Sequence, residues 1–274
     1  MLAEATYRKT TPAEARPLSG PDARARIVCR RLAARCPQAS RLVAAALPVE
    51  MHDDALAIVA FDRGAAACVA GARSSAEGHR ALDEWEEQLE RAFFGEATRP
   101  VFVSLGRAIE ARDLPLPPLR AIIAGHRLAL DGARPATFEA QCARLRMVSA
   151  PWGQLLLALL GERDAALHPY VEDLCMGWQL AWALAGIGRD PSRGLIAIPA
   201  EDLRHYGITD AAFADEDSPR TREILCLQVM RAGTFLLRGR PLLERLSGPS
   251  LGAFSQLMDS ALATLDALPR HPLH

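Results

Sequence analysis

The most informative pattern in the sequence lies in two neighbouring segments, GWQLAWALAGIGRD at residues 177–190 and RGLIAIPAEDLRHYGI at residues 193–208. The first belongs to a long apolar helical stretch, which we expect to cover about 165–188 and to end near Gly186 and Gly188. The second is the least helical part of the chain, because a short apolar run leads into Pro199 before a short helix resumes. A long helix, an irregular turn and a short helix are therefore expected here.

Helical patterns cover nearly all of the remaining chain. Ser74 followed by Glu77 forms a possible capping box, and Thr137 suits the N-cap position of a later helix. Pro151 is expected at the first position of a further helix, where the missing N–H of proline costs nothing. The other expected helices cover residues 22–35, 51–70, 119–130, 218–238 and 250–268.

The organisation expected from this pattern is simple. We find no alternating strand pattern, no repeat of fixed period and no linker long enough to separate two domains. The sequence thus predicts an all-α protein with one helical domain over residues 21–270. Residues 1–20 are polar and contain two prolines, so a flexible N-terminal segment is expected there.

Composition excludes several classes of protein. Half of the 274 residues are hydrophobic and 24% are charged, which is ordinary for a globular chain and argues against disorder. A net charge of −1 and only 5% aromatic residues argue against a nucleic-acid-binding protein. Lys9 is the only lysine, so the body of the chain has no Schiff-base nucleophile. The six cysteines include no CxxC pair and are expected to be buried free thiols.

The location expected from the sequence is the cytoplasm. The N-terminus has no apolar signal core, and the most apolar stretches are too short to span a bilayer. Residues 23–35, ARARIVCRRLAAR, form the one basic amphipathic stretch that suits peripheral contact with a membrane, and they equally suit an ordinary surface helix.

Two general catalytic motifs are missing, since the chain has no GxxxxGK[ST] loop and no HExxH. His126, beside Arg127, is a weak functional candidate, since a lone histidine is more often exposed or satisfied in a core.

Acidic residues give one stronger candidate. Asp53 and Asp54 are adjacent, so they point to different sides of a helix and do not chelate one ion together. Glu201 and Asp202 open a short helix, where capping is the expected role. Asp62 lies inside an apolar helical stretch, where a carboxylate needs a partner unless it sits on an exposed edge.

Two further segments complete a pattern with the first. They are LPVEMHDDALAIVAFDRGAAACVAG at residues 47–71 and IAGHRLALDGARPATFEAQCARLRMVSAPWGQLLLALLG at residues 123–161. Together with the segments at 177–208, they resemble the signature regions of the squalene/phytoene synthase family in order and spacing. The resemblance covers roughly residues 38–268.

This resemblance implies an isoprenoid synthase-like helical bundle around a central apolar cavity. Active members of the family join two prenyl diphosphates head to head, and some process the cyclopropyl intermediate. Mg²⁺ held by two facing aspartate-rich helices neutralises the diphosphate as the carbocation forms. A dry cavity shields that cation from water.

The chain departs from the family at the metal-binding positions. The first aspartate-rich motif falls on Ala66, Ala67 and Ala70, so its three carboxylates are missing. In the second motif the first aspartate falls on Gly186, and only Asp190 remains. No metal ligand set is therefore assigned, although the resemblance implies Mg²⁺.

Other charged residues survive at positions that match the family. Arg63, Arg127, Arg146 and Arg193 are candidates for binding a diphosphate directly, because guanidinium groups bind phosphate oxygens bidentately. Asp62 lies one helical turn before Ala66, about 40° around the helix axis, so it is a candidate catalytic carboxylate together with Asp190.

Three hypotheses remain open at this point. The first is a non-catalytic isoprenoid-binding protein, or an accessory subunit of an intact relative or other partner, in hopanoid- or carotenoid-type metabolism. The second is an active prenyl-diphosphate or presqualene-diphosphate enzyme that uses Asp62, Asp190 and the arginines. The third, a helical scaffold with coincidental similarity, is disfavoured by three ordered matches.

Overall fold

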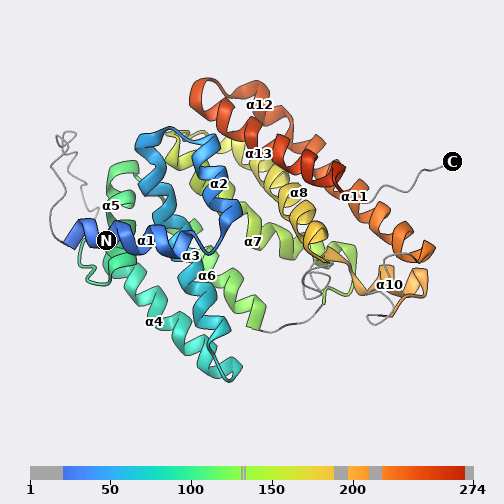
Figure 1. Ribbon diagram of the computed structural model, residues 1–274, viewed down its shortest axis with the longest axis horizontal. Helices are drawn as coiled ribbons and strands as arrows, with labels where there is room; N and C mark the ends of the chain where they lie inside the picture. The colour runs from blue at the N-terminus through green and yellow to red at the C-terminus, as the bar shows by residue number, and fades with distance from the viewer. Residues whose placement is uncertain (1–20, 131, 133, 188–196, 210–217, 269–274) are drawn as a thin grey trace, which may run out of the picture.

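A computed structural model of the protein describes residues 21–130, 132, 134–187, 197–209 and 218–268. Within these ranges the chain is helical and forms no strand, which confirms the all-α prediction. Figure 1 shows the helices in chain order, namely α1 (Pro21–Ala33), α2 (Pro37–Ala46), α3 (His52–Ala70), α4 (Ser75–Phe93), α5 (Pro100–Arg112), α6 (Leu116–Leu130), α7 (Phe138–Leu159), α8 (His168–Gly186), α10 (Ala200–Tyr206), α11 (Pro219–Gly239), α12 (Pro241–Arg245) and α13 (Gly248–Asp266). Short 3-10 turns at Val49–Met51 and Ala165–Leu167 lead into α3 and α8.

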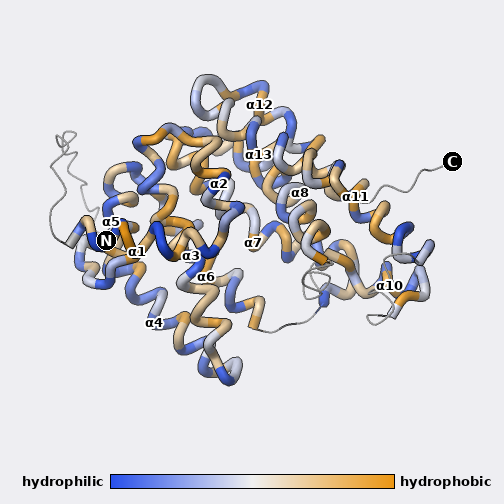
Figure 2. The backbone as a smooth tube through the Cα atoms, in the orientation of Figure 1, coloured by the Kyte–Doolittle hydropathy of each residue, from blue (hydrophilic) through white to orange (hydrophobic). Residues whose placement is uncertain are grey.

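Two hydrophobic clusters lie on either side of α7. Helices α1 to α6 surround the first cluster, and α8 and α10 to α13 surround the second (Figure 1). Leu155 of α7 belongs to the first cluster and Leu145 to the second. Figure 2 shows hydrophobic and hydrophilic residues alternating along the helices, as expected where each helix buries one side only. Helix α7 therefore couples the two halves of the molecule.

Helix α3 is the centre of the first half and packs against α1, α4, α5 and α6. Phe61 of α3 and Phe102 of α5 meet edge to face at 6.0 Å, and Trp85 of α4 completes the aromatic group. Gly64 allows this arrangement, because a Cβ at that position would lie 2.2 Å from the Trp85 ring. The close approach holds α4 against the part of α3 that follows Asp62.

Helix α8 is the centre of the second half and packs against α7, α11 and α13. At Gly239 the end of α11 touches the α8 backbone, since a Cβ there would lie 2.7 Å from the backbone nitrogen of Leu174. Glycine is therefore required at this crossing for steric reasons.

Capping explains where several helices start. Ser74 Oγ accepts a hydrogen bond of 3.2 Å from the backbone N–H of Glu77, and Thr137 Oγ1 accepts one of 3.2 Å from Ala140. Both predicted caps are thus confirmed. The Glu77 side chain accepts from the backbone N–H of Arg73 at 2.9 Å, one residue earlier than in the usual capping box.

The prediction for Pro151 is wrong. Helix α7 is continuous from Phe138 to Leu159, and Pro151 lies in its interior rather than at a start. A proline inside a helix costs about 3 kcal/mol. Each fully buried leucine contributes about 1.5–3 kcal/mol, and α7 buries Leu145, Leu155 and Leu157 between the two halves. Burial therefore outweighs the local proline signal.

The predictions for the surface and the cysteines have mixed outcomes. Helix α1 buries Ala25, Cys29 and Ala33 in the protein core, so the apolar side of the basic segment 23–35 faces inward. All six cysteines are free thiols, as predicted, but only Cys29 and Cys175 are buried. Cys226 is exposed, and the other three are half-buried. Among the described residues, no helix is long and apolar enough to cross a membrane.

Candidate functional site

The candidate site in the first half is a cluster of Asp62, Arg63 and His126, here called the Asp62 cluster. Asp62 Oδ2 accepts hydrogen bonds from Arg63 Nε at 2.9 Å and from Arg63 Nη2 at 2.5 Å. Asp62 Oδ1 lies 2.8 Å from His126 Nε2 of α6, which donates because an ionised carboxylate only accepts. Both carboxylate oxygens are therefore already engaged by neighbouring side chains.

Charge and burial act against each other in this cluster. Burial disfavours the charged form of Asp62, but the hydrogen bond from His126 and the charge of Arg63 outweigh it and lower the pKa of the carboxyl group. Burial likewise disfavours the charged form of Arg63, and the Asp62 carboxylate outweighs that effect and raises the pKa of the guanidinium. The cluster is thus an ion pair at neutral pH, with no carboxyl group held neutral to act as an acid.

The part of α3 beyond Asp62 carries methyl groups in place of oxygen ligands. Ala66 is half-buried, and Ala67 and Ala70 are exposed. In the part of the chain that the structure describes, no three residues among His, Cys, Asp and Glu are grouped so that they could hold a metal ion.

The arginines expected to bind diphosphate lie in different places. Arg127 of α6 contacts α4 through Asp83 at 2.7 Å and Glu86 at 3.0 Å. Arg146 of α7 has a longer contact of 3.6 Å with Glu172 of α8, and 53% of its side chain is exposed. Of the three assigned arginines that the structure describes, only Arg63 contacts Asp62.

Two of the expected site residues, Asp190 and Arg193, lie outside the described residues. Their assignments remain predictions from the sequence.

Glu201 joins the start of α10 to the start of α7. Its Oε1 accepts a hydrogen bond of 2.6 Å from the backbone N–H of Phe138. The backbone N–H of Glu201 donates to the carbonyl of Ala136 at 3.0 Å, and that of Ala200 donates to the carbonyl of Pro135 at 2.9 Å. The side chain of Glu201 therefore caps α7 rather than the helix that contains it.

Asp202 forms a second buried cluster, here called the Asp202 cluster, with Gln228 and Arg231 of α11. Gln228 Nε2 donates to Asp202 Oδ2 at 2.7 Å, and Arg231 Nη2 donates to Oδ1 at 3.3 Å. Arg231 Nη1 also donates to Oδ2, and the guanidinium stacks on the Phe138 ring at 3.9 Å. Asp202 thus lies in the first turn of α10, as predicted, but its side chain pairs with Arg231 and Gln228 instead of capping the helix.

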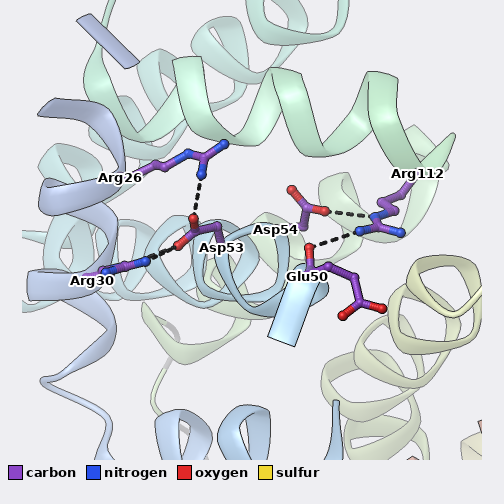
Figure 3. A network of polar contacts seen from close by, with 6 residues as sticks. All are labelled: Arg26, Arg30, Glu50, Asp53, Asp54 and Arg112. Carbon is purple, nitrogen blue, oxygen red and sulfur yellow. Dashed lines mark hydrogen bonds and ion pairs between the residues drawn. The ribbon is translucent and has the colours of Figure 1, made fainter. Parts of the chain in front are cut away.

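The adjacent pair Asp53 and Asp54 behaves as the helix geometry predicts. Figure 3 shows the two side chains pointing to different helices. Asp53 pairs with Arg26 at 2.6 Å and Arg30 at 2.9 Å in α1, whereas Asp54 pairs with Arg112 in α5 at 2.8 Å (Figure 3). Asp53 thus joins α3 to α1 and Asp54 joins α3 to α5, so the two carboxylates do not form a shared metal site.

Two of the hollows formed by the described residues lie away from the Asp62 cluster. The larger one has a volume of about 380 Å³ and lies between α11, α12 and α13. We call it the α11 groove. The other has a volume of about 270 Å³ and lies beside Arg112 and Arg163. Asp62, Ala66 and the exposed alanines of α3 line neither hollow.

Comparison with known proteins adds independent information. The family model described as squalene/phytoene synthase matches residues 37–274. A phytoene synthase of Arthrospira platensis is 30% identical over 222 residues, which are 76% of this chain and 72% of the relative. A 15-cis-phytoene synthase of Synechococcus elongatus is 26% identical over 232 residues, which are 80% of this chain and 75% of the relative.

Solved structures share the same fold. The squalene synthase HpnC from Alicyclobacillus acidocaldarius superposes with a TM-score of 0.78 at 27% identity, over 89% of this chain and 92% of that one. A dehydrosqualene synthase superposes with a TM-score of 0.76 over 90% of this chain and 88% of that one. Its identity of 18% supports the fold alone. With three ordered signature regions and a family match over most of its length, the chain belongs to the squalene/phytoene synthase family.

Proposed function

We propose that this protein binds a prenyl diphosphate or a related isoprenoid without ionising it. It would serve hopanoid- or carotenoid-type metabolism as a binding protein or as an accessory subunit of an intact relative. The observation that carries the proposal is the Asp62 cluster, in which the charge of Arg63 already balances the one acidic side chain in this part of α3 and His126 donates a hydrogen bond to it.

The chemistry of prenyl transfer explains why this matters. A diphosphate leaves an allylic carbon only if its developing charge is neutralised, and Mg²⁺ does this when oxygen ligands hold it. Alanine stands at positions 66, 67 and 70, where the family resemblance implies carboxylates. The donor set of the described residues therefore does not fit a group of diphosphate-bound Mg²⁺ ions, and Asp190 supplies only one further carboxylate.

Two arginines support binding without metal. Arg146 has one long contact of 3.6 Å to Glu172, so its guanidinium keeps most of its hydrogen-bonding capacity. Arg63 is 34% exposed and uses part of its fork on Asp62. A guanidinium binds diphosphate oxygens in a bidentate manner, so these side chains suit an anionic headgroup.

The test is calorimetric titration with a non-hydrolysable thio-analogue of farnesyl diphosphate, in Mg²⁺ and in EDTA. We expect dissociation constants that agree within about twofold and no release of diphosphate from farnesyl diphosphate. Replacing Arg146 with Gln should weaken binding about tenfold, the value of one charge-assisted hydrogen bond. The matched control is Arg80→Gln, at an exposed arginine of α4.

Two results would contradict the binding role. Binding that requires Mg²⁺, together with diphosphate release that Asp190→Ala abolishes, would establish the active enzyme. No binding under either condition would leave the accessory role, which co-purification with an intact relative tests directly.

A further inference from the structure

The outer side of α11 carries a regular stripe of residues, here called the α11 stripe, which are exposed except for the half-buried Gly233. Met230 and Leu237, two large apolar side chains, are 63% and 69% exposed. Cys226 lies on the same side and is the exposed cysteine of the chain. The stripe consists of Glu223, Cys226, Met230, Gly233, Leu237 and Arg240.

The stripe has no covering element within the described residues. Helix α11 packs against α8 through its opposite side, which buries Ile224, Gln228, Phe235 and Leu236. The α11 groove runs beside the stripe and contains Leu237 together with Leu262 of α13. Helix α11 lies at one edge of the molecule (Figure 1).

The spacing along the stripe is that of a coiled-coil seam. Successive members are separated by three, four, three, four and three residues, which keeps them on one face of a helix. The pattern is also symmetric about its centre, between residues 231 and 232. An antiparallel copy of the same helix would therefore place Met230 opposite Gly233 and Cys226 opposite Leu237.

The charges at the two ends of the stripe complement each other in that arrangement. Glu223 stands at one end and Arg240 at the other, and neither forms an ion pair with any residue that the structure describes. In an antiparallel pair, each Glu223 faces the Arg240 of the partner subunit at both ends. A parallel pair would instead bring like charges together.

The centre of the stripe fits the same partner. A Cβ added at Gly233 would meet nothing within 4 Å, so the surface is open at that point. A methionine side chain is flexible and fills an irregular gap of this kind well. The 18 residues from Glu223 to Arg240 span about 25 Å of helix, enough for two heptads of contact.

We propose that the α11 stripe binds a second copy of this chain, with the two α11 helices antiparallel about a twofold axis. The interface is self-complementary, as twofold symmetry requires, and the net charge of −1 does not drive the copies apart. This inference does not depend on the proposed function.

Charge reversal with sedimentation velocity tests the pairing. The variant Glu223→Arg presents two arginines in its stripe, and Arg240→Glu presents two glutamates. Each variant alone should dimerise at least about tenfold more weakly than the natural chain. An equimolar mixture of the two variants should form a heterodimer, because both end pairs then join opposite charges. Glu87→Arg on α4 is the matched control and should leave the dimer unchanged.

Cross-linking provides a second test with a geometric readout. Leu237→Cys places a thiol opposite Cys226 of the partner subunit, so mild oxidation should give a covalent dimer with two disulfides. The added change Cys226→Ser should abolish that dimer. A natural chain that stays monomeric at about 100 μM, or a dimer that neither charge variant weakens, would overturn the proposal.

Discussion

Asp62 of α3 and His126 of α6 are 64 residues apart in the chain and lie 2.8 Å apart, Oδ1 to Nε2. This hydrogen bond joins the two helices. Because Arg63 donates to the other carboxylate oxygen, Asp62 has little capacity left to bind a ligand. The residue with the strongest catalytic case in the first half of the sequence therefore has a clear structural role.

Replacing Asp62 with Asn should lower the free energy of unfolding by about 2–3 kcal/mol, because it leaves the Arg63 charge without its partner in a largely buried place. Chemical denaturation at pH 7 measures the change. Asp113→Asn serves as the control, since Asp113 is exposed and an asparagine accepts its positive φ of 50°. A loss below about 0.5 kcal/mol for Asp62→Asn would contradict the role assigned to the cluster.

The same pair predicts a pH dependence of stability. The pKa of Asp62 in the folded protein is below that in the unfolded chain, which is about 3.9. Its stabilisation is fully present above that value and is lost as the pH falls through the folded pKa. The difference between the natural chain and Asp62→Asn should therefore shrink as acid is added below about pH 4. If the difference in free energy of unfolding instead grew as the pH fell, the pKa of Asp62 would be raised by folding and not lowered.

Replacing Asp202 with Ala should cost about 3 kcal/mol, because Arg231 would keep a buried charge without a partner. Arg231→Lys should cost less, since it retains the charge but loses the planar stacking on Phe138. Thermal unfolding followed by circular dichroism measures both variants. Arg238→Ala is the control, because its pair with Asp173 is exposed on the arginine side. Equal effects for Asp202→Ala and Arg238→Ala would argue against the buried cluster.

Two glycines on the second half give opposite predictions. Gly239→Ala should destabilise the fold by about 1–3 kcal/mol, because the new Cβ would meet the Leu174 backbone at 2.7 Å. Gly252→Ala should stabilise it by about 0.5–1 kcal/mol, since this helical glycine of α13 has open space around it. Urea denaturation compares the two directly. If both variants changed the free energy of unfolding in the same direction, the steric contact at Gly239 would not explain the effect.

Restoring carboxylates to α3 tests the proposed loss of metal chemistry. The triple variant Ala66→Asp, Ala67→Asp and Ala70→Asp should fold, because two of these positions are exposed and the third is half-buried. We expect its binding of the farnesyl thio-analogue to become at least about tenfold stronger in Mg²⁺ than in EDTA. The control carries three aspartates at exposed alanines elsewhere, namely Ala76, Ala124 and Ala263. If the triple variant bound the analogue equally well in Mg²⁺ and in EDTA, the missing carboxylates of α3 would not explain the loss of metal binding.

Much of the fold follows from local sequence signals. The caps at Ser74 and Thr137, the helix end at Gly186 and the restart after Pro199 are all found where the sequence predicts them. These features depend on hydrogen bonds and dihedral preferences within a few residues, so a single sequence contains them. Helix α5 begins at Pro100, a proline at the first helical position, but this helix was not predicted from the sequence.

The polar clusters are less predictable because their members are distant in sequence. Nothing in the spacing of Asp62 and His126 indicates a contact, since that contact depends on how α3 packs against α6. Asp202 and Arg231 are likewise brought together by the packing of α10 on α11. Gln228 and Arg231 are three residues apart on one helical face, which is the one local hint of the Asp202 cluster.

The Glu201 and Asp202 contacts change what the motif PAEDL at residues 199–203 can be taken to mean. In this chain both acids have structural roles: Glu201 binds the backbone at the start of α7, and Asp202 joins α10 to α11. Neither contact requires a substrate. Natural selection on folding alone would then preserve the motif in a lineage that has abandoned synthesis. A genome survey that identifies active prenyl synthases by this motif would therefore also count family members that no longer catalyse synthesis.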